Sequence, residues 1–166
     1  MMMNLRAFLI ALFLLPSCAF AQQQPGPEIL FGAPLADLAG QPAALARFRG
    51  QPLIINFWAR WCGPCQTEIP DIVAEYARAQ SAGVQVVGIA LDDKPDAVRD
   101  FAKAYDIGYP VLLLKDNGPD LLKQLGNPKA GLPYTLLVNR KGEIVERKLG
   151  AMSRADVVSA VDAVSK

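Results

Sequence analysis

The 166-residue chain contains no histidine and only three cysteines, Cys18, Cys62 and Cys65. A structural zinc site takes four ligands, usually thiolates and imidazoles. Covalent haem attachment needs a histidine directly after a Cys-x-x-Cys pair, and residue 66 is glutamine. The chain also has no second cysteine pair. We therefore expect no metal ion and no other cofactor.

The chain also lacks a clear excess of charge, with 17 Lys and Arg residues against 16 Asp and Glu residues. Proteins that bind nucleic acid or an anionic membrane surface usually carry a marked basic excess. We therefore expect no nucleic-acid partner. The length suits one domain with a substantial core.

The apolar run near the start, residues 7–15, is too short for the roughly 20 residues that a membrane-spanning helix needs. It follows a basic head and precedes small residues, which is typical of a signal peptide over residues 1–21. A short anchoring or buried helix is the alternative. We expect residues 22–30 to form a flexible leader and residues 31–166 to form the domain.

Two ways of processing that segment compete. Ala19-Phe20-Ala21 fits the small-x-small cleavage pattern, which predicts a soluble exported product cut after Ala21. Leu15-Pro-Ser-Cys18 resembles a lipoprotein box, although its proline departs from the usual pattern. Only lipidation of Cys18 would place the protein at a membrane.

Buried strands and amphipathic helices alternate along the rest of the chain. The strands are expected at 53–58, 84–91 and 109–114, and helices begin near Gly63 and Pro95. A short hairpin at 35–45, a short helix at 120–125, a hairpin at 134–149 and a final helix capped by Ser153 complete the pattern. This order predicts an α/β domain with a mixed central sheet and helices on both faces.

The pair Cys62 and Cys65 is either a structural disulfide or a redox centre. A loop of four residues gives a structural disulfide roughly 2 kcal/mol, against about 3 kcal/mol for a 15-residue loop. The pair instead follows a buried strand and opens a helix, where free N–H groups and the helix dipole favour a thiolate at Cys62. Cys65 lies one turn further on and should be shielded. Pro64 suits the first turn, where its missing N–H costs nothing.

Three motifs carry a resemblance to a known family. The stretch FWARWCGPC over residues 57–65 closely resembles the thioredoxin active site, and Pro70 matches the kink proline of its helix. The stretch GLPYT over residues 131–135 resembles the cis-proline loop of thioredoxins. Within that superfamily, Asn56-Phe-Trp-Ala-x-Trp-Cys and Cys-x-x-Glu-x-Pro resemble the exported TlpA/ResA-like branch.

The resemblance covers about residues 31–166 and implies a thioredoxin-like fold with an N-terminal β-hairpin at 37–45 and a strand and helix insertion at 92–125. It implies an exported, periplasmic thiol–disulfide oxidoreductase. In such an enzyme Cys62 attacks a client disulfide and Cys65 resolves the mixed disulfide. Cys62 and Cys65 then alternate between a dithiol and a disulfide.

The resemblance also implies the residues that contact the client. Gly63 and Pro64 lie between the cysteines, and Trp61 directly precedes the nucleophile at the surface. The peptide bond between Leu132 and Pro133 is expected to be cis, with the Leu132 backbone able to pair with an extended client peptide.

Glu68 interrupts the apolar stripe of the helix that begins near Gly63. Partial burial should raise its pKa and make it a proton acceptor near neutral pH. The position where cytoplasmic thioredoxins carry a buried aspartate is Asn56, which cannot titrate. We therefore expect Glu68 to assist deprotonation of Cys65; in the alternative, Glu68 reaches solvent or an arginine such as Arg60.

The Gly-Pro dipeptide resembles that of thioredoxin, a reductant at about −270 mV, rather than a strong oxidant near −120 mV. We therefore expect a reductant of client proteins with disulfides. The family suggests a DsbD-type membrane thiol reductase as its electron donor and cytochrome c maturation as a role.

Two other functions remain open from the sequence. Peroxiredoxins share the fold, but they carry Thr or Ser three residues and Pro seven residues before their reactive cysteine, where this chain has Ala59 and Ile55. The second alternative is a non-catalytic binding or chaperone module on the same scaffold. The intact Cys-Gly-Pro-Cys sequence argues against it.

Overall fold

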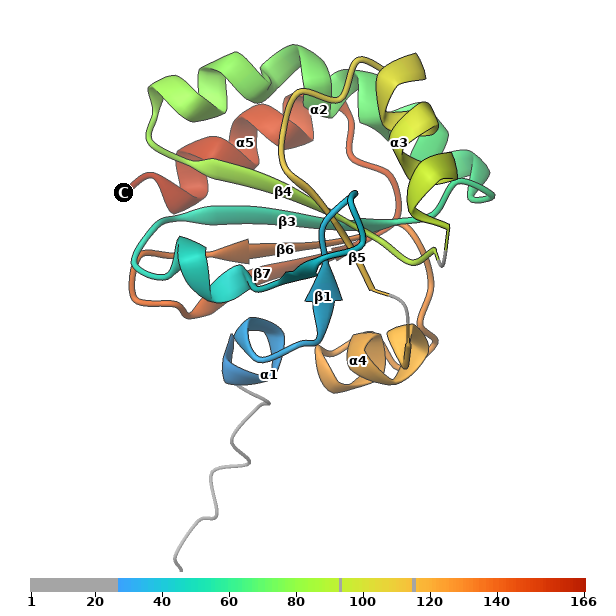
Figure 1. The fold of residues 1–166 in the computed structure, drawn as a ribbon. Coiled ribbons are helices and arrows are strands. Elements are labelled where there is room, and N and C mark those ends of the chain that lie inside the picture. Colours follow the sequence, from blue (N-terminus) through green and yellow to red (C-terminus); the bar gives the residue numbers. More distant parts are fainter. Residues whose placement is uncertain (1–26, 93, 115) are drawn as a thin grey trace, which may run out of the picture.

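The computed structural model describes residues 27–92, 94–114 and 116–166. In those residues a seven-stranded sheet has the strand order β2-β1-β5-β4-β3-β6-β7 (Figure 1). The strands are β1 Leu35–Ala36, β2 Pro42–Ala43, β3 Leu53–Trp58, β4 Gln85–Ala90, β5 Val111–Leu113, β6 Tyr134–Val138 and β7 Ile144–Leu149. The helices are α1 Pro27–Phe31, the 3-10 helix η1 Leu45–Phe48, α2 Gly63–Ser81, α3 Pro95–Ala104, α4 Gly118–Gln124 and α5 Arg154–Val164.

The sheet is mixed, as the sequence predicts. Strands β3, β4 and β5 pair in parallel, whereas β6 pairs with β3, and β7 with β6, in antiparallel fashion. The hairpin of β1 and β2 adds to the other edge through an antiparallel contact with β5. Strand β3 is buried along its whole length because neighbouring strands and helices cover it on all sides.

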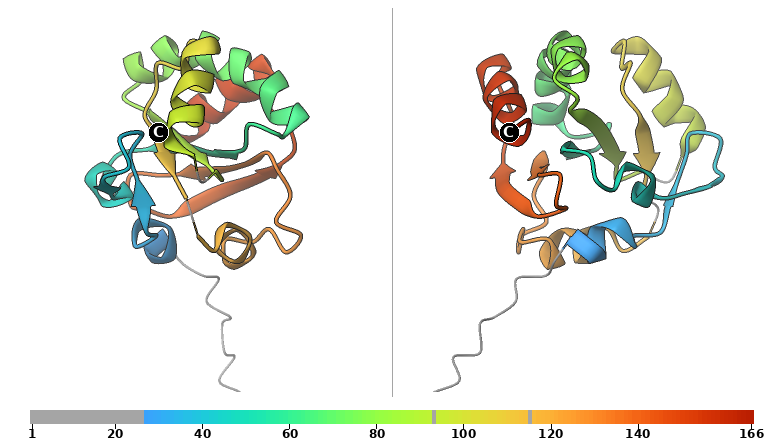
Figure 2. Two further views of the ribbon diagram at one scale, coloured as in Figure 1. Left: turned by 45° about the vertical axis from the view of Figure 1, so that its right-hand side comes forward. Right: turned by 90° about the vertical axis from the view of Figure 1, so that its left-hand side faces the viewer.

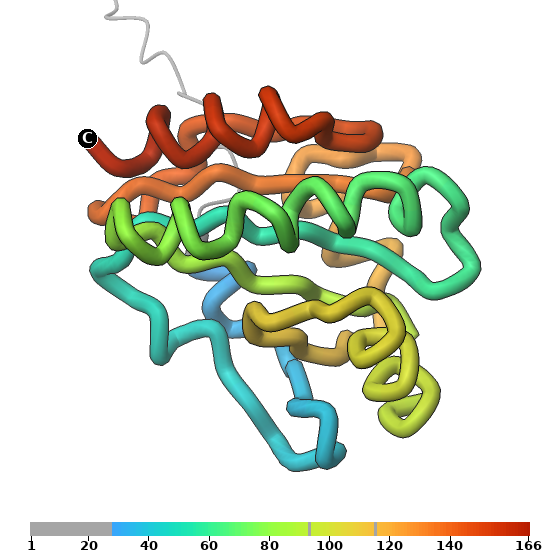
Figure 3. The backbone as a smooth tube through the Cα atoms, turned by 90° about the horizontal axis from the view of Figure 1, so that it is seen from above, coloured from blue at the N-terminus to red at the C-terminus, as the bar shows by residue number. Residues whose placement is uncertain are grey.

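Helices cover both faces of the sheet, as predicted (Figures 1 and 2). On one face α2 and α5 run side by side, and α3 lies on the other side of α2 from α5 (Figure 3). Alternate residues of β3, such as Ile54 and Trp58, contribute to the core on that face. Ile55 and Phe57 point to the opposite face, which α1, η1 and α4 cover.

The expected flexible leader is wrong over residues 27–30. The structure forms helix α1 there, and Leu30 is fully buried in the core on the face that α4 also covers. The folded domain thus includes Pro27 to Phe31, because burial of Leu30 and Phe31 offsets the entropy of ordering this segment. The predicted signal peptide, both processing sites and residues 22–26 lie outside the described residues. Within the described ranges, no helix is long and apolar enough to cross a bilayer.

Candidate active site

The cysteine loop connects the end of β3 to the start of α2. Cys62 caps the helix in an extended conformation, with φ of −87° and ψ of 103°. Its sulfur is bonded to that of Cys65 in a disulfide, with the two Cα atoms 5.3 Å apart. The Cys65 backbone N–H also donates to the Cys62 Sγ at 3.2 Å. A thiolate at Cys62 would therefore receive one of the free N–H groups at the helix start.

The two cysteines differ in their access to solvent. Cys65 is fully buried, whereas Cys62 is 6% exposed and is followed by exposed Gly63 and Pro64. Trp61 is 73% exposed, as the sequence predicts for a residue that contacts a client. A macromolecular disulfide could thus reach Cys62 but not Cys65.

Trp58 and Pro70 flank the cysteine loop in the sequence. Trp58 is fully buried and stacks on Phe101 of α3, with ring centroids 5.0 Å apart. Pro70 lies inside α2 on its exposed side, where its missing N–H removes one hydrogen bond of the helix. Trp58 therefore belongs to the core and is not part of the client-contacting surface.

Glu68 lies one turn after Cys65 and is only 1% exposed. The Asn56 Nδ2 donates to its Oε1 at 2.7 Å, and the backbone N–H of Met152 donates to its Oε2 at 2.8 Å. Asn56 also donates from the same Nδ2 to the Thr135 Oγ1 at 3.1 Å. Both carboxylate oxygens are therefore held by neutral donors from β3 and from the turn before α5.

Burial raises the pKa of the Glu68 carboxyl to about 7. Desolvation disfavours the charged form, while the hydrogen bonds from Met152 and Asn56 and the positive charge of Lys148 pull the pKa back down. The carboxyl can therefore take up and release a proton near neutral pH. Burial raises the pKa of the Tyr109 phenol, and the nearby charge of Glu68 raises it further.

The alternative prediction, in which Glu68 reaches an arginine such as Arg60, is wrong. Arg60 makes a two-pronged ion pair with Asp92, with Nε to Oδ2 at 2.7 Å and Nη2 to Oδ1 at 3.1 Å. The Asp92 side chain is almost fully buried, so the guanidinium compensates its charge. The Gln66 side chain also donates to the Arg60 carbonyl oxygen at 2.6 Å, which ties the cysteine loop to α2.

The second client-binding segment lies at the start of β6. The peptide bond between Leu132 and Pro133 is cis, as predicted. The antiparallel register pairs Tyr134 with Phe57, so Pro133 lies beside the carboxyl end of β3, from which the cysteine loop emerges. The Pro133 carbonyl accepts a hydrogen bond from the Gly150 N–H at 2.9 Å.

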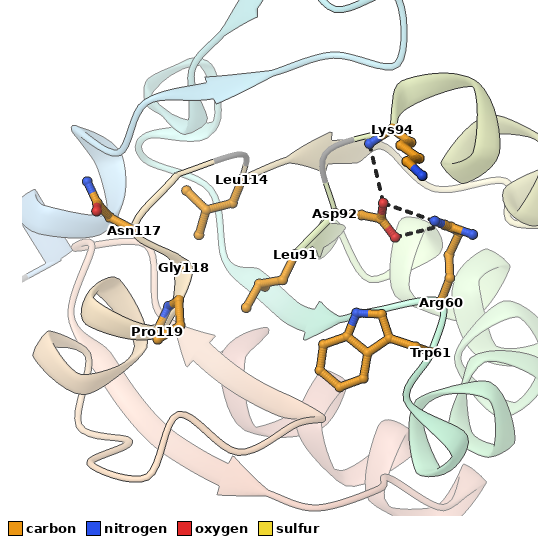
Figure 4. A pocket seen from close by; sticks show the side chains of 9 residues that line it. All are labelled: Arg60, Trp61, Leu91, Asp92, Lys94, Leu114, Asn117, Gly118 and Pro119. Atoms are coloured by element: carbon orange, nitrogen blue, oxygen red, sulfur yellow. Dashed lines mark hydrogen bonds and ion pairs between the residues drawn. The ribbon is translucent and has the colours of Figure 1, made fainter.

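A pocket of about 440 Å³ opens beside Trp61 (Figure 4). Trp61, Leu91, Leu114 and Pro119 give it apolar walls, and the Arg60 ion pair forms one side. The walls come from the cysteine loop and from the segments that follow β4 and β5. In the described ranges, no group of three or more His, Cys, Asp or Glu side chains could hold a metal ion.

Sequence reasoning missed three parts of the site. The Met152 donor is a backbone group 84 residues from Glu68, and Thr135 is 79 residues from its partner Asn56. The position of Asp92 is one signal that could have revealed its ion pair, because an acidic residue directly after a buried strand needs a cation nearby. These contacts depend on strand order and register, which the residue types do not reveal.

The AhpC/TSA family profile matches residues 25–147 of the chain. The thiol-disulfide oxidoreductase ResA of Bacillus thuringiensis subsp. konkukian is 30% identical over 120 residues. That alignment covers 72% of this chain and 67% of ResA.

Two solved structures are similar to most of the described fold. The thioredoxin-related protein of Neisseria meningitidis serogroup B is 30% identical with a TM-score of 0.70, and the match covers 78% of this chain and 97% of that one. A secreted disulfide oxidoreductase of Mycobacterium tuberculosis, described as homologous to DsbE of E. coli, is 25% identical with a TM-score of 0.66. That match covers 82% of this chain and 98% of the M. tuberculosis chain.

Proposed function

The chain belongs to the AhpC/TSA family and is a thiol–disulfide oxidoreductase of the TlpA/ResA-like branch, and from that premise we propose that it reduces client disulfides in the periplasm. One observation carries the proposal. The disulfide of Cys62 and Cys65 caps helix α2, and the buried carboxyl of Glu68 lies one turn behind it. This is a redox pair with an adjacent proton acceptor.

The first step uses the reduced form of the pair. The Cys62 thiolate attacks one sulfur of the client disulfide, a new S–S bond forms, and the other client sulfur leaves as a thiolate. The Cys65 N–H, which contacts the Cys62 sulfur at 3.2 Å, and the dipole of α2 stabilise the attacking anion. The exposure of Trp61, Gly63 and Pro64 around Cys62 gives the client access.

The second step resolves the mixed disulfide. Cys65 loses its proton to Glu68 and attacks the Cys62 sulfur, which releases the client as a dithiol and leaves the Cys62–Cys65 disulfide. Two electrons have then passed from the enzyme to the client. A carboxyl with a pKa of about 7 accepts that proton more readily as pH rises through 7, so resolution should accelerate over this range.

Client binding involves two segments. The backbone of Leu132, beside the carboxyl end of β3, pairs with an extended client strand, and the cis Pro133 has no N–H to compete. Trp61 packs against the client next to its cysteine, and an apolar client side chain occupies the pocket of Trp61, Leu91 and Pro119. The sequence resemblance supports the first segment, and the exposure of Trp61 supports the second.

The proposed location of the protein and the proposed direction of electron transfer rest on separate observations. The signal-peptide pattern of residues 1–21 and the secreted relative from M. tuberculosis support export. The Gly63-Pro64 dipeptide supports a reducing potential. In an oxidising compartment the pair must be re-reduced, and a DsbD-type membrane thiol reductase would supply the electrons. Cytochrome c maturation would supply the clients.

A trapping experiment tests the function. Replacing Cys65→Ser should leave clients attached to Cys62, because resolution is blocked after attack. The adducts should appear on non-reducing gels of periplasmic extract and vanish with dithiothreitol. The Cys62→Ser variant is the matched control and should trap nothing. If Cys65→Ser protein also yields no adduct, the oxidoreductase cycle proposed here is wrong.

The peroxidase alternative has no support in the site. Ala59 and Ile55 occupy the positions of the peroxiredoxin Thr and Pro, and both are fully buried. The site therefore lacks a hydroxyl to hold a peroxide at Cys62. Peroxide consumption by the reduced protein should not exceed that of a free dithiol, and a rate many-fold higher would reverse this conclusion.

A further inference from the structure

A row of polar side chains crosses three strands next to Glu68. The register pairs Asn56 of β3 with Thr135 of β6, and Thr135 with Lys148 of β7. Residues paired across a sheet project to the same face, so all three side chains point toward α2 and α5. Asn56 and Thr135 belong to the hydrogen-bonded group around Glu68. Lys148 is the next residue in this row, and it brings a positive charge to the row.

Lys148 has a counterion on α5. Its Nζ lies 3.3 Å from the Asp156 Oδ1, and both side chains are little more than one-third exposed. The Ser153 N–H donates to the other Asp156 oxygen at 2.8 Å in a capping box. The residue before Ser153 is Met152, whose N–H donates to Glu68. One turn of chain thus presents a donor to Glu68 and a carboxylate to Lys148.

A small cavity of about 80 Å³ connects these groups. It is lined by Thr135, Met152, Lys148 and Asp156, together with Leu137, Glu146, Ser159 and Ala160. Thr135 and Met152 also belong to the group that holds Glu68. The charge of Lys148 favours the charged form of Glu68. Asp156 lies against Lys148 at the same cavity.

We propose that Lys148 and Asp156 are positioning residues that set the proton affinity of Glu68 in opposite directions. The Lys148 ammonium favours the Glu68 carboxylate, and the Asp156 carboxylate weakens that effect by partly neutralising Lys148. The pair would fix the pH at which Glu68 accepts the Cys65 proton, and in this respect the inference rests on the proposed function. Both residues would act through Glu68 and not on the disulfide itself.

The other charged or titratable groups near Glu68 leave room for this control. On α2, Cys65 lies one turn before it, and Glu75 lies two turns after it in an ion pair with Arg154 of α5. Tyr109, before β5, is neutral near pH 7, as a phenol ordinarily is, and burial raises its pKa further. On β7, Glu146 is exposed at the rim of the cavity. Lys148 is the cation among the groups that act on Glu68.

The test measures the pKa of the Glu68 carboxyl directly in the oxidised protein, by ¹³C NMR with labelled glutamate. Replacing Lys148→Met should raise that pKa by about 0.5, because a favourable charge is lost. Asp156→Asn keeps an oxygen for the capping box and should lower the pKa by a similar or smaller amount. Lys148→Arg should restore the wild-type value. Lys141→Met, at the exposed tip of the hairpin, is the matched control and should change nothing.

Opposite shifts from the two variants support the proposal, because a merely structural disturbance would move both in one direction. Equal pKa values in wild type, Lys148→Met and Asp156→Asn would overturn it, as would shifts of the same sign. Circular dichroism and thermal unfolding check that each variant is folded. The rate of mixed-disulfide resolution is measured separately. If the pKa shifts but the rate profile does not follow, the inference stands and the base role of Glu68 fails.

Discussion

Helix α2 buries two glutamates, Glu68 and Glu75, on the side that faces the sheet and α5. Glu75 forms an ion pair with a cation, because its Oε1 accepts a hydrogen bond from the Arg154 Nε. In the part of the chain that the structure describes, Glu68 accepts hydrogen bonds from neutral donors, the Asn56 side chain and the Met152 backbone. The two residues have the same side chain and nearly the same burial, and they differ in what faces them.

That difference in partners bears on how readily a buried carboxyl gains a proton. An ion pair keeps a buried carboxylate charged at the cost of desolvating a cation. Neutral donors stabilise the charge less, so burial raises the pKa of Glu68 to about 7. The acid next to the cysteines can therefore change its protonation state near pH 7.

The largest expected effect is on rate. Glu68→Gln should slow resolution of a Cys62 mixed disulfide at pH 7.5 by about 10²-fold, because the proton acceptor is lost. Glu75→Gln should leave that rate within about twofold of wild type, since Glu75 lies two turns further from the pair. Stopped-flow release of a model peptide thiol measures both. Equal losses in the two variants would erase the distinction between the two acids.

The next effect is on stability and depends on pH. The folded pKa of Glu68, about 7, lies above its ordinary value of 4.5. Its contribution to stability is therefore fully present below pH 4.5 and is lost as pH rises through 7. Glu68→Gln removes this loss, so the oxidised variant should gain roughly 3 kcal/mol over wild type at pH 8 and nothing at pH 4. Urea unfolding at the two pH values measures it, and a constant difference would contradict the assignment.

The smallest effect concerns the ion pair of Glu75. Arg154→Met leaves a buried carboxylate without its cation, but the Arg154 side chain is 66% exposed, so we expect a loss of only about 1 kcal/mol. Arg78→Met breaks an exposed pair with Asp162 on the same two helices and should cost less than about 0.5 kcal/mol. Thermal unfolding ranks the two variants. If Arg78→Met costs as much, burial of Glu75 has no special consequence.

The sequence predicts most of the fold because its local signals agree. Apolar runs mark β3 and β4, Cys-Gly-Pro-Cys marks the start of α2, and Ser153 marks the start of α5. Helix α1 is not predicted from the sequence, because its five residues are too few to show a helical period. Its stability comes from burying Leu30 and Phe31 against distant parts of the chain.

The site is predictable only in part. The burial of Glu68 follows from its place in an apolar stripe, but its Met152 donor is a backbone group brought in by the turn before α5. The place of Lys148 depends on a register shift between Leu137 and Val138. Pairing counted from the hairpin turn without that shift would set Arg147 opposite Thr135 and point Lys148 to the other face.

The most direct test of the account is the pH dependence of resolution in wild type and Glu68→Gln, from pH 5.5 to 9. The central claim is that the buried carboxyl of Glu68 accepts the Cys65 proton. It predicts that the wild-type rate rises with an inflection near pH 7 and that this inflection is absent in Glu68→Gln. The same inflection in both proteins would contradict the claim.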